Sequence, residues 1–366
     1  MLVVNAGSSS LKLKSYPSGR SYLAERLAHR GSHGEALEAG LLSLGGRGYA
    51  PYVVGHRIVH GGIRYTAPTA VTDEVLAGIE ELEALAPLHN PANLAALRSA
   101  LRLVPDAVHV AVFDTAFHAT LPRRAYLYGL PPSFAAKGLR RYGFHGTSHD
   151  YVSREAARLL GRPRGDLRIV TLHLGNGASG AAVDHGVVVD TSMGFTPLEG
   201  LLMGTRSGDI DPGLVLHLQR EGMTEEDLDE LLNRRSGLAG MSGVSNDMRD
   251  VRAAADAGSE DARAALEVYA YRIRKLIGGY AAAMGGIDAV VFTAGVGEND
   301  HRIRAEAVEG LSFLGLELDP EANRAGGPVV SSGTSAVAVL VVATDEESVI
   351  ASLATEVARG LKVRAS

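Results

Sequence analysis

Two charged residues lie in sequence contexts that are typical of a ligand site. Arg57 stands in VGHRIVHGG beside Ile58 and Val59, and a guanidinium next to an apolar pocket can hold a small carboxylate through two parallel hydrogen bonds. Asp114 ends the apolar run of VFDTAFH, and side chains at the carboxyl ends of strands face the ligand in α/β sheets. A solvated surface arginine and a helix N-cap are the ordinary alternatives.

Glycine-rich turns follow three apolar runs: NAGSSS at residues 5–10, HLGNGAS at 173–179 and TAGVGEN at 293–299. Glycine lets the backbone approach a ligand, and successive N–H groups in such turns form a nest for an anion. None of the three fits the P-loop pattern, in which Gly-Lys-Ser/Thr opens a helix. One such turn is weak evidence, because ordinary strand turns use the same residues. Three of them at strand ends favour a site for nucleotide phosphates.

A third arginine, Arg206, lies in the glycine-flanked loop MGTRSGDIDPG close to Asp209 and Asp211. It is a further site candidate, although an ordinary Asp/Pro/Gly turn has the same composition.

Metal ligands can be sought among the thirteen histidines. Two pairs have i, i+4 spacing: His56 with His60, and His145 with His149. Neither pair has the glutamate of HExxH, and the chain has no cysteine, so a structural zinc site is not expected. Magnesium requires only one or two protein oxygens besides substrate phosphates. Asn5, Asp114 and Glu346 could supply such oxygens.

The elements that must position these residues occur twice. Residues 2–5 form an apolar run and 11–16 alternate apolar with polar residues, which predicts two strands joined by a turn. The same pattern recurs as strands at 169–174, 180–184 and 187–190. Gly7 and Gly175, in the two turns, are separated by about one domain length. The sequence therefore predicts two topologically equivalent halves, each opening with a hairpin loop.

Other segments complete the two halves. Helical periodicity marks 71–88, 262–284 and 346–366, and a helix capped near Thr147 ends at Gly161. Strands are expected at 107–117, 288–299 and 336–343. The Gly-, Ala- and His-rich segment 20–50 has weak periodicity and is expected to be a surface excursion.

The composition is that of a globular protein, with 46% hydrophobic and 21% charged residues. A length of 366 residues exceeds one ordinary core, so two domains are expected. The formal charge of −6 argues against a nucleic-acid or anionic-membrane partner. No signal peptide is evident and the longest apolar run, 336–343, is far shorter than a membrane span, so a cytoplasmic protein is expected.

Eight motifs resemble, in their order, those of one family: NAGSSSLK, GHRIVHGG, APLHNPANL, FDTAFHATLP, YGFHGTSHDYV, LHLGNGASGAAV, DTSMGFTPLEGLLMGTRSGDIDPG and GVGEN. From residue 2 to about residue 350 the chain resembles the acetate kinases, within the superfamily of acetate and sugar kinases, heat-shock protein 70 and actin. The resemblance implies an α/β fold of two duplicated RNase H-like (actin-like ATPase) domains with a nucleotide cleft between them. It places the first domain at 1–147, completed by the terminal helix 347–366, and the second at 148–346.

The resemblance also implies the reaction and its participants. These are ATP-dependent phosphorylation of acetate to acetyl phosphate, with ATP/ADP as co-substrate, Mg²⁺ or Mn²⁺ as cofactor, and a homodimeric enzyme. The implied catalytic residues are Arg57, Asp114, His145 and Arg206. The implied substrate-binding residues are Arg57, Val59, Leu88, Phe144 and Pro197. The implied nucleotide-binding residues are Ser8, Ser10, Lys12, His173, Leu174, Gly175, Asn176, Gly177, Asp247, Met248, Arg249, Gly295, Val296, Gly297, Glu298 and Asn299. The implied metal ligands are Asn5 and Glu346.

Three features depart from the family pattern. Met248 replaces the aromatic residue of the family's DFR motif, which affects packing at the adenine end of the nucleotide. Ala294 replaces a second glycine in TAGVGEN, and the segment 20–50 is shorter than in most relatives.

Two questions stay open from the sequence. Acetate is already ionised at pH 7, so no proton need be removed before attack, and we expect Asp114 to orient an arginine or anchor a magnesium-bound water. The acyl chain is also open, because one methylene in an apolar pocket changes binding by only about 1–3 kcal/mol, and a propionate or other short-chain acyl kinase is the alternative. A non-catalytic ATP-driven clamp of the same superfamily is a remote alternative, because a clamp has no use for Arg57 and Arg206.

Overall fold

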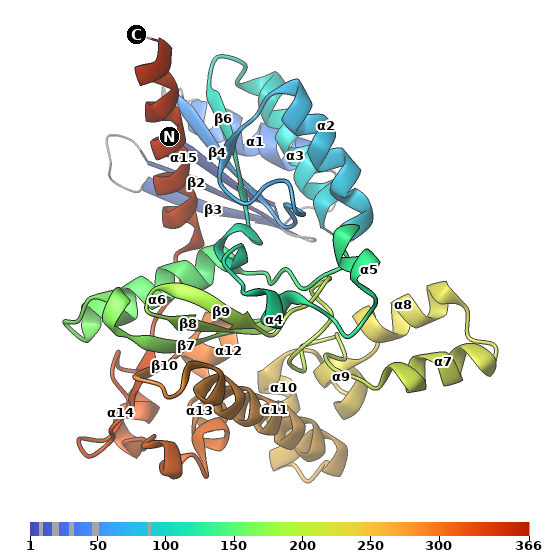
Figure 1. Ribbon diagram of the computed structural model, residues 1–366, viewed down its shortest axis with the longest axis vertical. Helices are drawn as coiled ribbons and strands as arrows, with labels where there is room; N and C mark the ends of the chain where they lie inside the picture. The colour runs from blue at the N-terminus through green and yellow to red at the C-terminus, as the bar shows by residue number, and fades with distance from the viewer. Residues whose placement is uncertain (7–9, 17–21, 29–32, 46–50, 87–88, 366) are drawn as a thin grey trace. The chain divides into compact units, whose positions relative to one another are not determined.

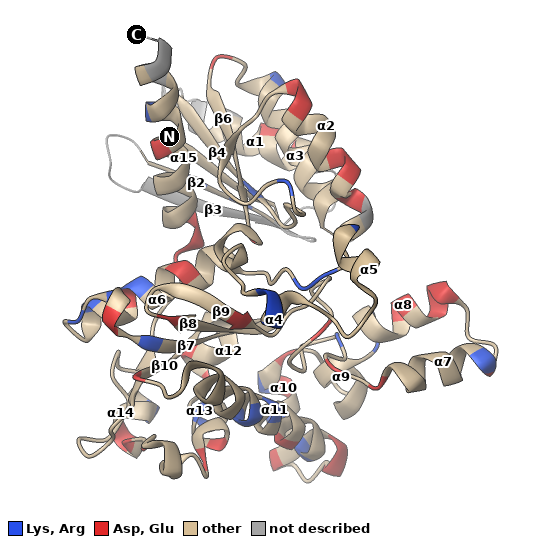
Figure 2. Ribbon diagram, in the orientation of Figure 1, with Lys and Arg blue, Asp and Glu red and all other residues tan. Residues whose placement is uncertain are grey.

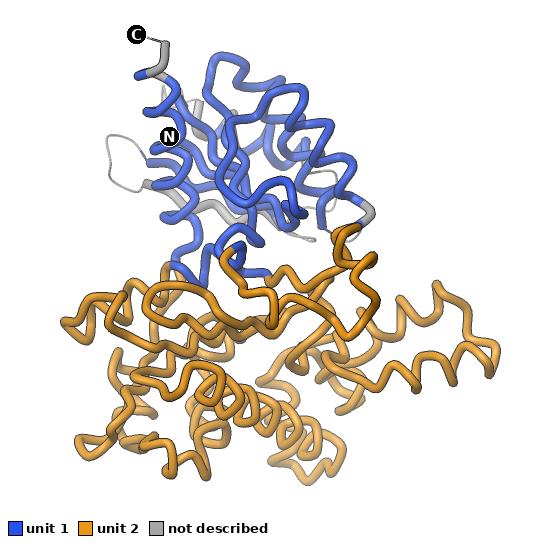
Figure 3. The backbone as a smooth tube through the Cα atoms, in the orientation of Figure 1, with its two compact units in different colours: residues 1–119, 144–150, 345–366 blue, residues 120–143, 151–344 orange. Residues whose placement is uncertain are grey.

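The computed structural model describes residues 1–6, 10–16, 22–28, 33–45, 51–86 and 89–365. The chain forms two compact units, each built from segments that are distant in the sequence (Figure 3). Unit 1 comprises Met1–Ala119, Phe144–Asp150 and Asp345–Ser366, and unit 2 comprises Thr120–Gly143 and Tyr151–Thr344. Each unit contains one β-sheet and the helices that pack on it (Figure 1).

Unit 1 is built on a six-stranded sheet with the order β3-β2-β1-β4-β6-β5. Its strands are β1 (Leu2–Ala6), β2 (Ser10–Ser15), β3 (Tyr22–Ala28), β4 (Val53–Ile58), β5 (Thr69–Ala70) and β6 (Val108–Phe113). Strand β2 pairs antiparallel with β1 and with β3, whereas β4 pairs parallel with β1 and with β6. The predicted opening hairpin is therefore confirmed as β1 and β2, and its turn at 7–9 lies outside the described residues.

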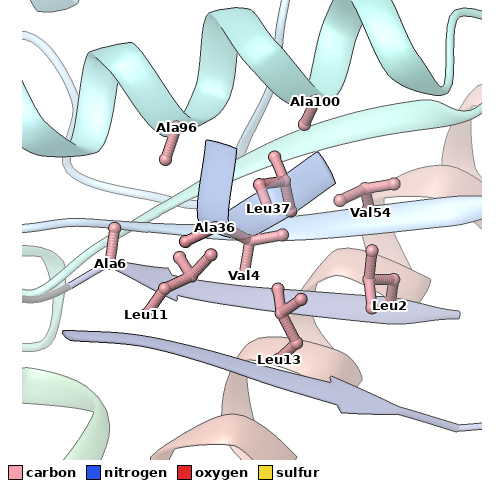
Figure 4. Packing of buried hydrophobic residues seen from close by; sticks show 10 residues of the cluster. All are labelled: Leu2, Val4, Ala6, Leu11, Leu13, Ala36, Leu37, Val54, Ala96 and Ala100. Atoms are coloured by element: carbon pink, nitrogen blue, oxygen red, sulfur yellow. The ribbon is translucent and has the colours of Figure 1, made fainter. Parts of the chain in front are cut away.

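Helices cover both faces of this sheet. They are α1 (His33–Gly45), α2 (Asp73–Glu81), α3 (Asn90–Leu103) and α15 (Glu346–Ala365), with 3-10 turns at Leu82–Leu85 and Ala116–His118. On one face Leu2 and Val4 pack with Leu37 of α1 in a core that also includes α3 (Figure 4). On the other face Val3 packs with Ile350 of α15. Successive residues of a strand point to opposite faces, so a strand buried on both sides needs the unbroken apolar run LVV.

The prediction of a surface excursion at 20–50 is wrong where that segment is described. Tyr22–Ala28 forms β3 of the sheet, and His33–Gly45 forms α1, whose Leu37 is fully buried with Leu11 of β2. The helix was not predicted because the apolar periodicity of its sequence is weak. It is stabilised by packing on the sheet rather than by its own helix propensity.

Unit 2 repeats the topology in a five-stranded sheet with the order β11-β10-β7-β8-β9. Its strands are β7 (Arg168–Leu174), β8 (Ala178–Asp184), β9 (Val187–Thr191), β10 (Ala289–Thr293) and β11 (Ala338–Val341). As in unit 1, the second strand pairs antiparallel with the first and the third: β8 pairs with β7 and β9. Strand β10 pairs parallel with β7 and β11, as β4 pairs with β1 and β6, and the short antiparallel β5 of unit 1 has no counterpart among the described strands of unit 2. The same order and the same directions in both units confirm the predicted duplication.

The longest helix of unit 2, α11 (Glu260–Met284), packs on its sheet. The other helices are α4 (Arg123–Tyr126), α5 (Pro132–Ala136), α7 (Pro212–Arg220), α8 (Glu225–Arg234), α9 (Gly237–Ser242), α10 (Met248–Asp256), α12 (Ala294–Asn299), α13 (His301–Val308) and α14 (Pro320–Ala325), with 3-10 turns at Arg164–Asp166 and Ser312–Leu314. Helix α6 (Gly146–Leu159) begins in unit 1 and continues in unit 2. Gly180 of β8 allows α11 to approach, because a Cβ there would lie 2.5 Å from Cδ2 of Leu276.

The third glycine-rich segment differs from the strand predicted for 288–299. Strand β10 ends at Thr293, and Ala294–Asn299 forms the short helix α12. Ala294 begins this helix with φ at 65°, in the left-handed region where a side chain costs about 1 kcal/mol relative to glycine. The side chain of Ala294 therefore has a backbone cost at this position.

Charged residues are spread over the surfaces of both units (Figure 2). Helix α2 is acidic at both ends, with Asp73 and Glu74 in its first turn and Glu80 and Glu81 in its last. Over the part of the chain that the structure describes, no helix combines the length and apolar character that crossing a bilayer requires.

Among the buried histidines of unit 1, three have a pKa that burial lowers, which favours their neutral form: His56, His109 and His118. Nε2 of His109 donates to the carbonyl of Val104 at 2.9 Å, so its Nδ1 accepts from Nε2 of His56 at 3.0 Å. Nε2 of His118 donates to the carbonyl of Phe144 at 2.9 Å. Burial lowers the pKa of His56, with a further contribution from His109, and it also lowers the pKa of His109. Burial lowers the pKa of His118 to about 4.

We expect unit 1 to lose stability in mild acid. Below about pH 6.5 the unfolded chain binds protons at these histidines while the folded chain does not, so the free energy of unfolding falls as the pH falls. The His118→Gln variant keeps a donor for the carbonyl of Phe144 but cannot titrate. Between pH 7 and pH 5 it should lose about 2 kcal/mol less than the wild-type protein in urea unfolding. Equal losses in the two proteins would contradict this assignment.

Candidate functional site

An ion pair between Arg57 and Asp114 lies at the carboxyl edge of the sheet of unit 1. Arg57 is near the end of β4 and Asp114 directly follows β6, and the two strands run parallel with Ile58 beside Phe113. Nε of Arg57 donates to Oδ1 and Oδ2 of Asp114 at 3.0 and 3.1 Å, and Nη2 donates to Oδ2 at 2.6 Å. Only 15% and 1% of these side chains are exposed. Arg57 is therefore not a solvated surface residue, and Asp114 is engaged with a guanidinium.

Burial and charge act in opposite directions on this pair. Burial lowers the pKa of Arg57, but the carboxylates of Asp114 and Glu346 raise it by more, so its net shift is upward. Burial raises the pKa of Asp114, while Arg57 and the backbone N–H of His145 partly offset the rise. Arg57 thus keeps its charge in a buried setting, which is where a guanidinium binds a carboxylate or a phosphate most strongly.

The amide of Asn5 connects this pair to the first turn of α15. Its Oδ1 accepts from Nη1 of Arg57 at 3.2 Å, and its Nδ2 donates to Oε1 of Glu347 at 2.9 Å. Oε2 of Glu346 lies 3.8 Å from Nε of Arg57, and Nζ of Lys12 lies 3.6 Å from Oε1 of Glu347. The structure therefore brings both predicted metal residues, Asn5 and Glu346, to Arg57.

The donors at this edge suit a hard cation. Within the described ranges, no group of three or more His, Cys, Asp or Glu side chains is arranged to hold a metal by itself. Asn5 and Glu346 contribute oxygen atoms only, and both contact Arg57. Magnesium prefers oxygen ligands and takes much of its coordination from substrate phosphates and water, so the residues present fit that ion.

A strained loop passes over Asp114. His145 has a φ of 56°, in the left-handed region that a side chain disfavours. The next residue, Gly146, donates its N–H to the backbone carbonyl of Asp114 at 3.1 Å. A Cβ at Gly146 would lie 2.1 Å from that carbonyl oxygen, so only glycine allows this approach. The loop holds the backbone of His145 against the Arg57–Asp114 pair.

Of the four apolar residues predicted around the substrate, three are described. Val59 and Phe144 are buried in unit 1, with 5% and 1% of their surface exposed. Pro197 lies in unit 2, where its carbonyl accepts from Nη1 of the predicted catalytic Arg206 at 3.1 Å. Burial lowers the pKa of Arg206. Leu88 lies outside the described residues.

Most of the nucleotide-site residues predicted in unit 2 line one cavity of about 810 Å³. They are Gly175, Asn176, Asp247, Met248, Arg249, Gly295, Val296 and Asn299. Thr293 and His173 pair at the ends of the parallel strands β10 and β7, so the loops that follow them leave the sheet at the same edge. The volume lies within the range of ordinary small-molecule sites.

Polar contacts hold the walls of this cavity. Nδ2 of Asn246 donates to Oδ1 of Asn176 at 2.9 Å. Asp247 caps α10 by accepting from the backbone N–H of Arg249 at 2.9 Å, and its carboxylate also pairs with the Arg249 side chain. These bonds lower the pKa of Asp247 to about 2. Met248 is 6% exposed and lines the cavity.

The remaining predicted nucleotide residues have other surroundings. Leu174 is fully buried in β7, and His173 is 8% exposed. The carbonyl of Gly177 accepts from the N–H of Gly175 at 3.0 Å, which closes the turn. A Cβ at Gly297 would lie 3.3 Å from the backbone of Phe292. Oε1 of Glu298 accepts from the N–H groups of Ala294 and Thr344 at 2.8 and 3.3 Å. This carboxylate therefore stabilises the start of its own helix, α12. Ser8 and the side chain of Ser10 lie outside the described residues.

Several residues at these sites were missed from the sequence. Asn246, Arg252, Asp256 and Arg302 also line the cavity, and no motif marks them. Glu347 accepts a hydrogen bond from Asn5. Its place next to Glu346, a predicted metal ligand, was a sequence signal that could have identified it. Asn90 and Asn93 lie in the motif APLHNPANL, from which the prediction took only Leu88.

Comparisons with known proteins agree on one family. The sequence profile of the Acetokinase family matches residues 50–352. The acetate kinase of Leifsonia xyli is 52% identical over 385 residues, covering 96% of this chain and 97% of that protein. The crystal structure of Porphyromonas gingivalis acetate kinase matches with a TM-score of 0.89 at 42% identity, and that of a propionate kinase from Francisella tularensis with 0.91 at 35%. Each match covers 97% of this chain and 98% of the other. With a matching family profile and a relative half identical over nearly its whole length, this chain belongs to the Acetokinase family.

Proposed function

We propose that this protein catalyses the reversible transfer of the γ-phosphoryl group of ATP to acetate, giving acetyl phosphate and ADP. The observation that carries the proposal is the buried guanidinium of Arg57, which Asp114 holds at the edge of a sheet with apolar residues on the same strand end. The family and the names of its relatives support the same reaction.

The acetate site is assigned to the end of β4. Arg57 is assigned to the carboxylate, and Val59, Leu88, Phe144 and Pro197 are assigned to the methyl group. A charged fork next to buried apolar side chains matches the two ends of acetate. His145, whose backbone contacts Asp114, and Arg206 are assigned to stabilise the charge that develops on the phosphoryl oxygens.

The nucleotide is assigned to the cavity of unit 2. The turn 175–177 and the short helix α12 would face the phosphates, because glycine lets the backbone approach a ligand closely. Asp247, Met248 and Arg249 at the start of α10 would face the nucleoside. Lys12 and Ser10 of β2, together with Ser8, are assigned to the terminal phosphates.

Magnesium is assigned to Asn5 and Glu346, and Mn²⁺ would fit the same oxygens. When bound, the ion would neutralise charge on the nucleotide phosphates. Both side chains contact Arg57, so the metal and the acetate carboxylate would be held by one connected group of residues.

Transfer to acetate needs positioning and charge stabilisation more than proton chemistry. An oxygen of the acetate carboxylate attacks the γ-phosphorus in line, and the bond from that phosphorus to the bridging oxygen of ADP breaks. Acetate is ionised at neutral pH, so the attacking oxygen carries no proton to remove. We therefore assign to Asp114 the orientation of Arg57, which its contacts with Nε and Nη2 support.

A homodimer is also proposed, with α7 at the interface. None of the residues of α7 is buried, although it carries three leucines, of which Leu214 and Leu216 are 46% and 51% exposed. A helix with an exposed apolar surface of this kind is stabilised by a partner. Light scattering should give twice the chain mass, and the Leu214→Glu/Leu216→Glu variant should give a monomer. A monomeric wild-type protein would reject the dimer.

The proposed reaction is tested by trapping acyl phosphate with hydroxylamine in the presence of ATP, Mg²⁺ and a short-chain acid. We expect acetohydroxamate, with kcat/KM falling about tenfold or more for each methylene added in propionate and butyrate. A preference for propionate would assign the protein to the alternative substrate that the Francisella structure suggests. ATP hydrolysis without any hydroxamate would favour the clamp, and no product from any acid would reject the kinase.

The orienting role of Asp114 is tested with Asp114→Asn. Removing one partner of a buried ion pair leaves the other charge uncompensated, so we expect kcat/KM for acetate to fall about 100-fold, with the acetate KM raised. The matched control is Glu74→Gln, which removes the carboxylate of the exposed Arg64–Glu74 pair at the same 2.6 Å separation and should change kcat/KM less than about twofold.

A double-mutant cycle separates orientation from direct chemistry. If Asp114 acts through Arg57, Arg57→Ala/Asp114→Asn should be no slower than Arg57→Ala alone. A folded Asp114→Asn protein with normal acetate KM, normal magnesium affinity and no turnover would instead show that Asp114 acts on the reacting atoms.

A further inference from the structure

Two asparagines of α3 hold the segment that follows β4, and the assignments above give them no part in the reaction. Asn90 and Asn93 lie three residues apart in the first turn of α3, so they share one face of the helix. Asn90 is fully buried and Asn93 is 2% exposed. A buried amide is costly unless its donors and its acceptor are satisfied, so both side chains must have fixed partners.

Asn93 joins the ends of β1 and β4. Its Nδ2 donates to the carbonyl of Ala6 at 2.7 Å, and its Oδ1 accepts from the N–H of Val59 at 3.0 Å. A carbonyl can only accept and an N–H can only donate, so chemistry determines the orientation of the amide. The backbone pairing of β1 with β4 extends only to Val4 and His56. Beyond that point the side chain of Asn93 supplies the donor and the acceptor that a neighbouring strand would provide.

The whole segment after β4 is held by side chains in this way. Four successive N–H groups donate to side-chain atoms: Val59 to Asn93, His60 to Asn90 at 3.1 Å, Gly61 to Thr115 at 3.0 Å and Gly62 to His60 at 2.9 Å. Nδ2 of Asn90 also donates to the carbonyl of His60 at 3.2 Å. The position of this segment therefore depends on the first turn of α3 and on Thr115, which directly follows Asp114.

We propose that Asn93 is a positioning residue for acetate, with Asn90 in support. It sets the separation between Asn5, which precedes Ala6, and the β4 end that carries Arg57 and Val59. A displacement of about 1 Å can reduce the rate of a positioned reaction by about 100-fold. The inference rests on the proposed function, because Arg57 and Val59 are assigned to acetate there.

The test compares Asn93→Asp with Leu97→Ala. Aspartate has the shape of asparagine and keeps an acceptor for Val59, but it has no donor for the carbonyl of Ala6. We expect the acetate KM to rise about tenfold or more, while the affinity for ADP, measured by calorimetry, changes less than about twofold because its cavity lies in unit 2. Leu97 lies one turn further along α3 in the apolar core with Ile58, so Leu97→Ala should lower stability and leave the acetate KM within about twofold.

A second measurement requires no turnover. In Asn93→Ala, hydrogen exchange of the peptide 57–62 should accelerate about tenfold relative to the β2 peptide 10–15 of the same protein. In Leu97→Ala both peptides should change together, because that variant lowers the stability of unit 1 as a whole.

The outcomes separate this inference from the proposed function. A wild-type protein that makes no acyl phosphate would reject the function, while the exchange data would still show whether Asn93 holds the segment. An active wild-type protein together with an unchanged acetate KM in Asn93→Asp would overturn the inference. An equal rise of KM in Leu97→Ala would also overturn it, because loss of stability would then explain both. Unchanged exchange in Asn93→Ala would show that the amide does not hold the segment.

Discussion

A buried arginine must have its charge compensated, and much of unit 1 is arranged to do this for Arg57. Asp114 provides two oxygens, Asn5 provides a third, and Glu346 adds a second negative charge nearby. These partners come from β6, β1 and α15, so the terminal helix belongs to the same unit as the opening strands. The desolvation of such a pair is expensive, and it persists only where every partner is held in place.

The acidic start of α15 is part of the same network. Three consecutive carboxylates, Asp345, Glu346 and Glu347, each contact a different cation. Their partners are Lys14 at 2.7 Å, Arg57 at 3.8 Å and Lys12 at 3.6 Å. Negative charge is also favourable at a helix N-terminus, so the helix and the sheet stabilise the same three groups. The contact of a C-terminal helix with an N-terminal hairpin thereby becomes part of the candidate site.

Because the sheet topology is duplicated, the segments assigned to acetate and to the nucleotide follow equivalent strands in the two sheets. The segment after the fourth strand is Val59–Gly62 in unit 1 and the short helix α12 in unit 2. In each case the carboxyl end of a parallel strand presents a segment held by side-chain acceptors: asparagines of α3 in one unit, Glu298 in the other. Irregular backbone needs such partners because no neighbouring strand satisfies its N–H groups. Under the proposed assignments, the same topology binds a carboxylate in one copy and a nucleotide in the other.

The sequence by itself determined the elements that have strong patterns: the two hairpins, their repetition, the long helix ending at Met284 and the terminal helix. It also marked Asp114 as a charged residue at a strand end and Arg57 as a charged residue among apolar neighbours. It did not reveal α1, because the sequence of this Ala- and Gly-rich helix has little apolar periodicity. The helix becomes stable only when it packs on β1 and β2. It did not assign Asn90, Asn93 and Glu347 either, although their motifs were visible. Periodicity reports which face of an element is apolar, whereas hydrogen bonds between distant segments follow from strand order. Only the tertiary structure could decide that Asn93 lies between Ala6 and Val59, because a side-chain amide acquires its partners when the strands that carry them are brought together.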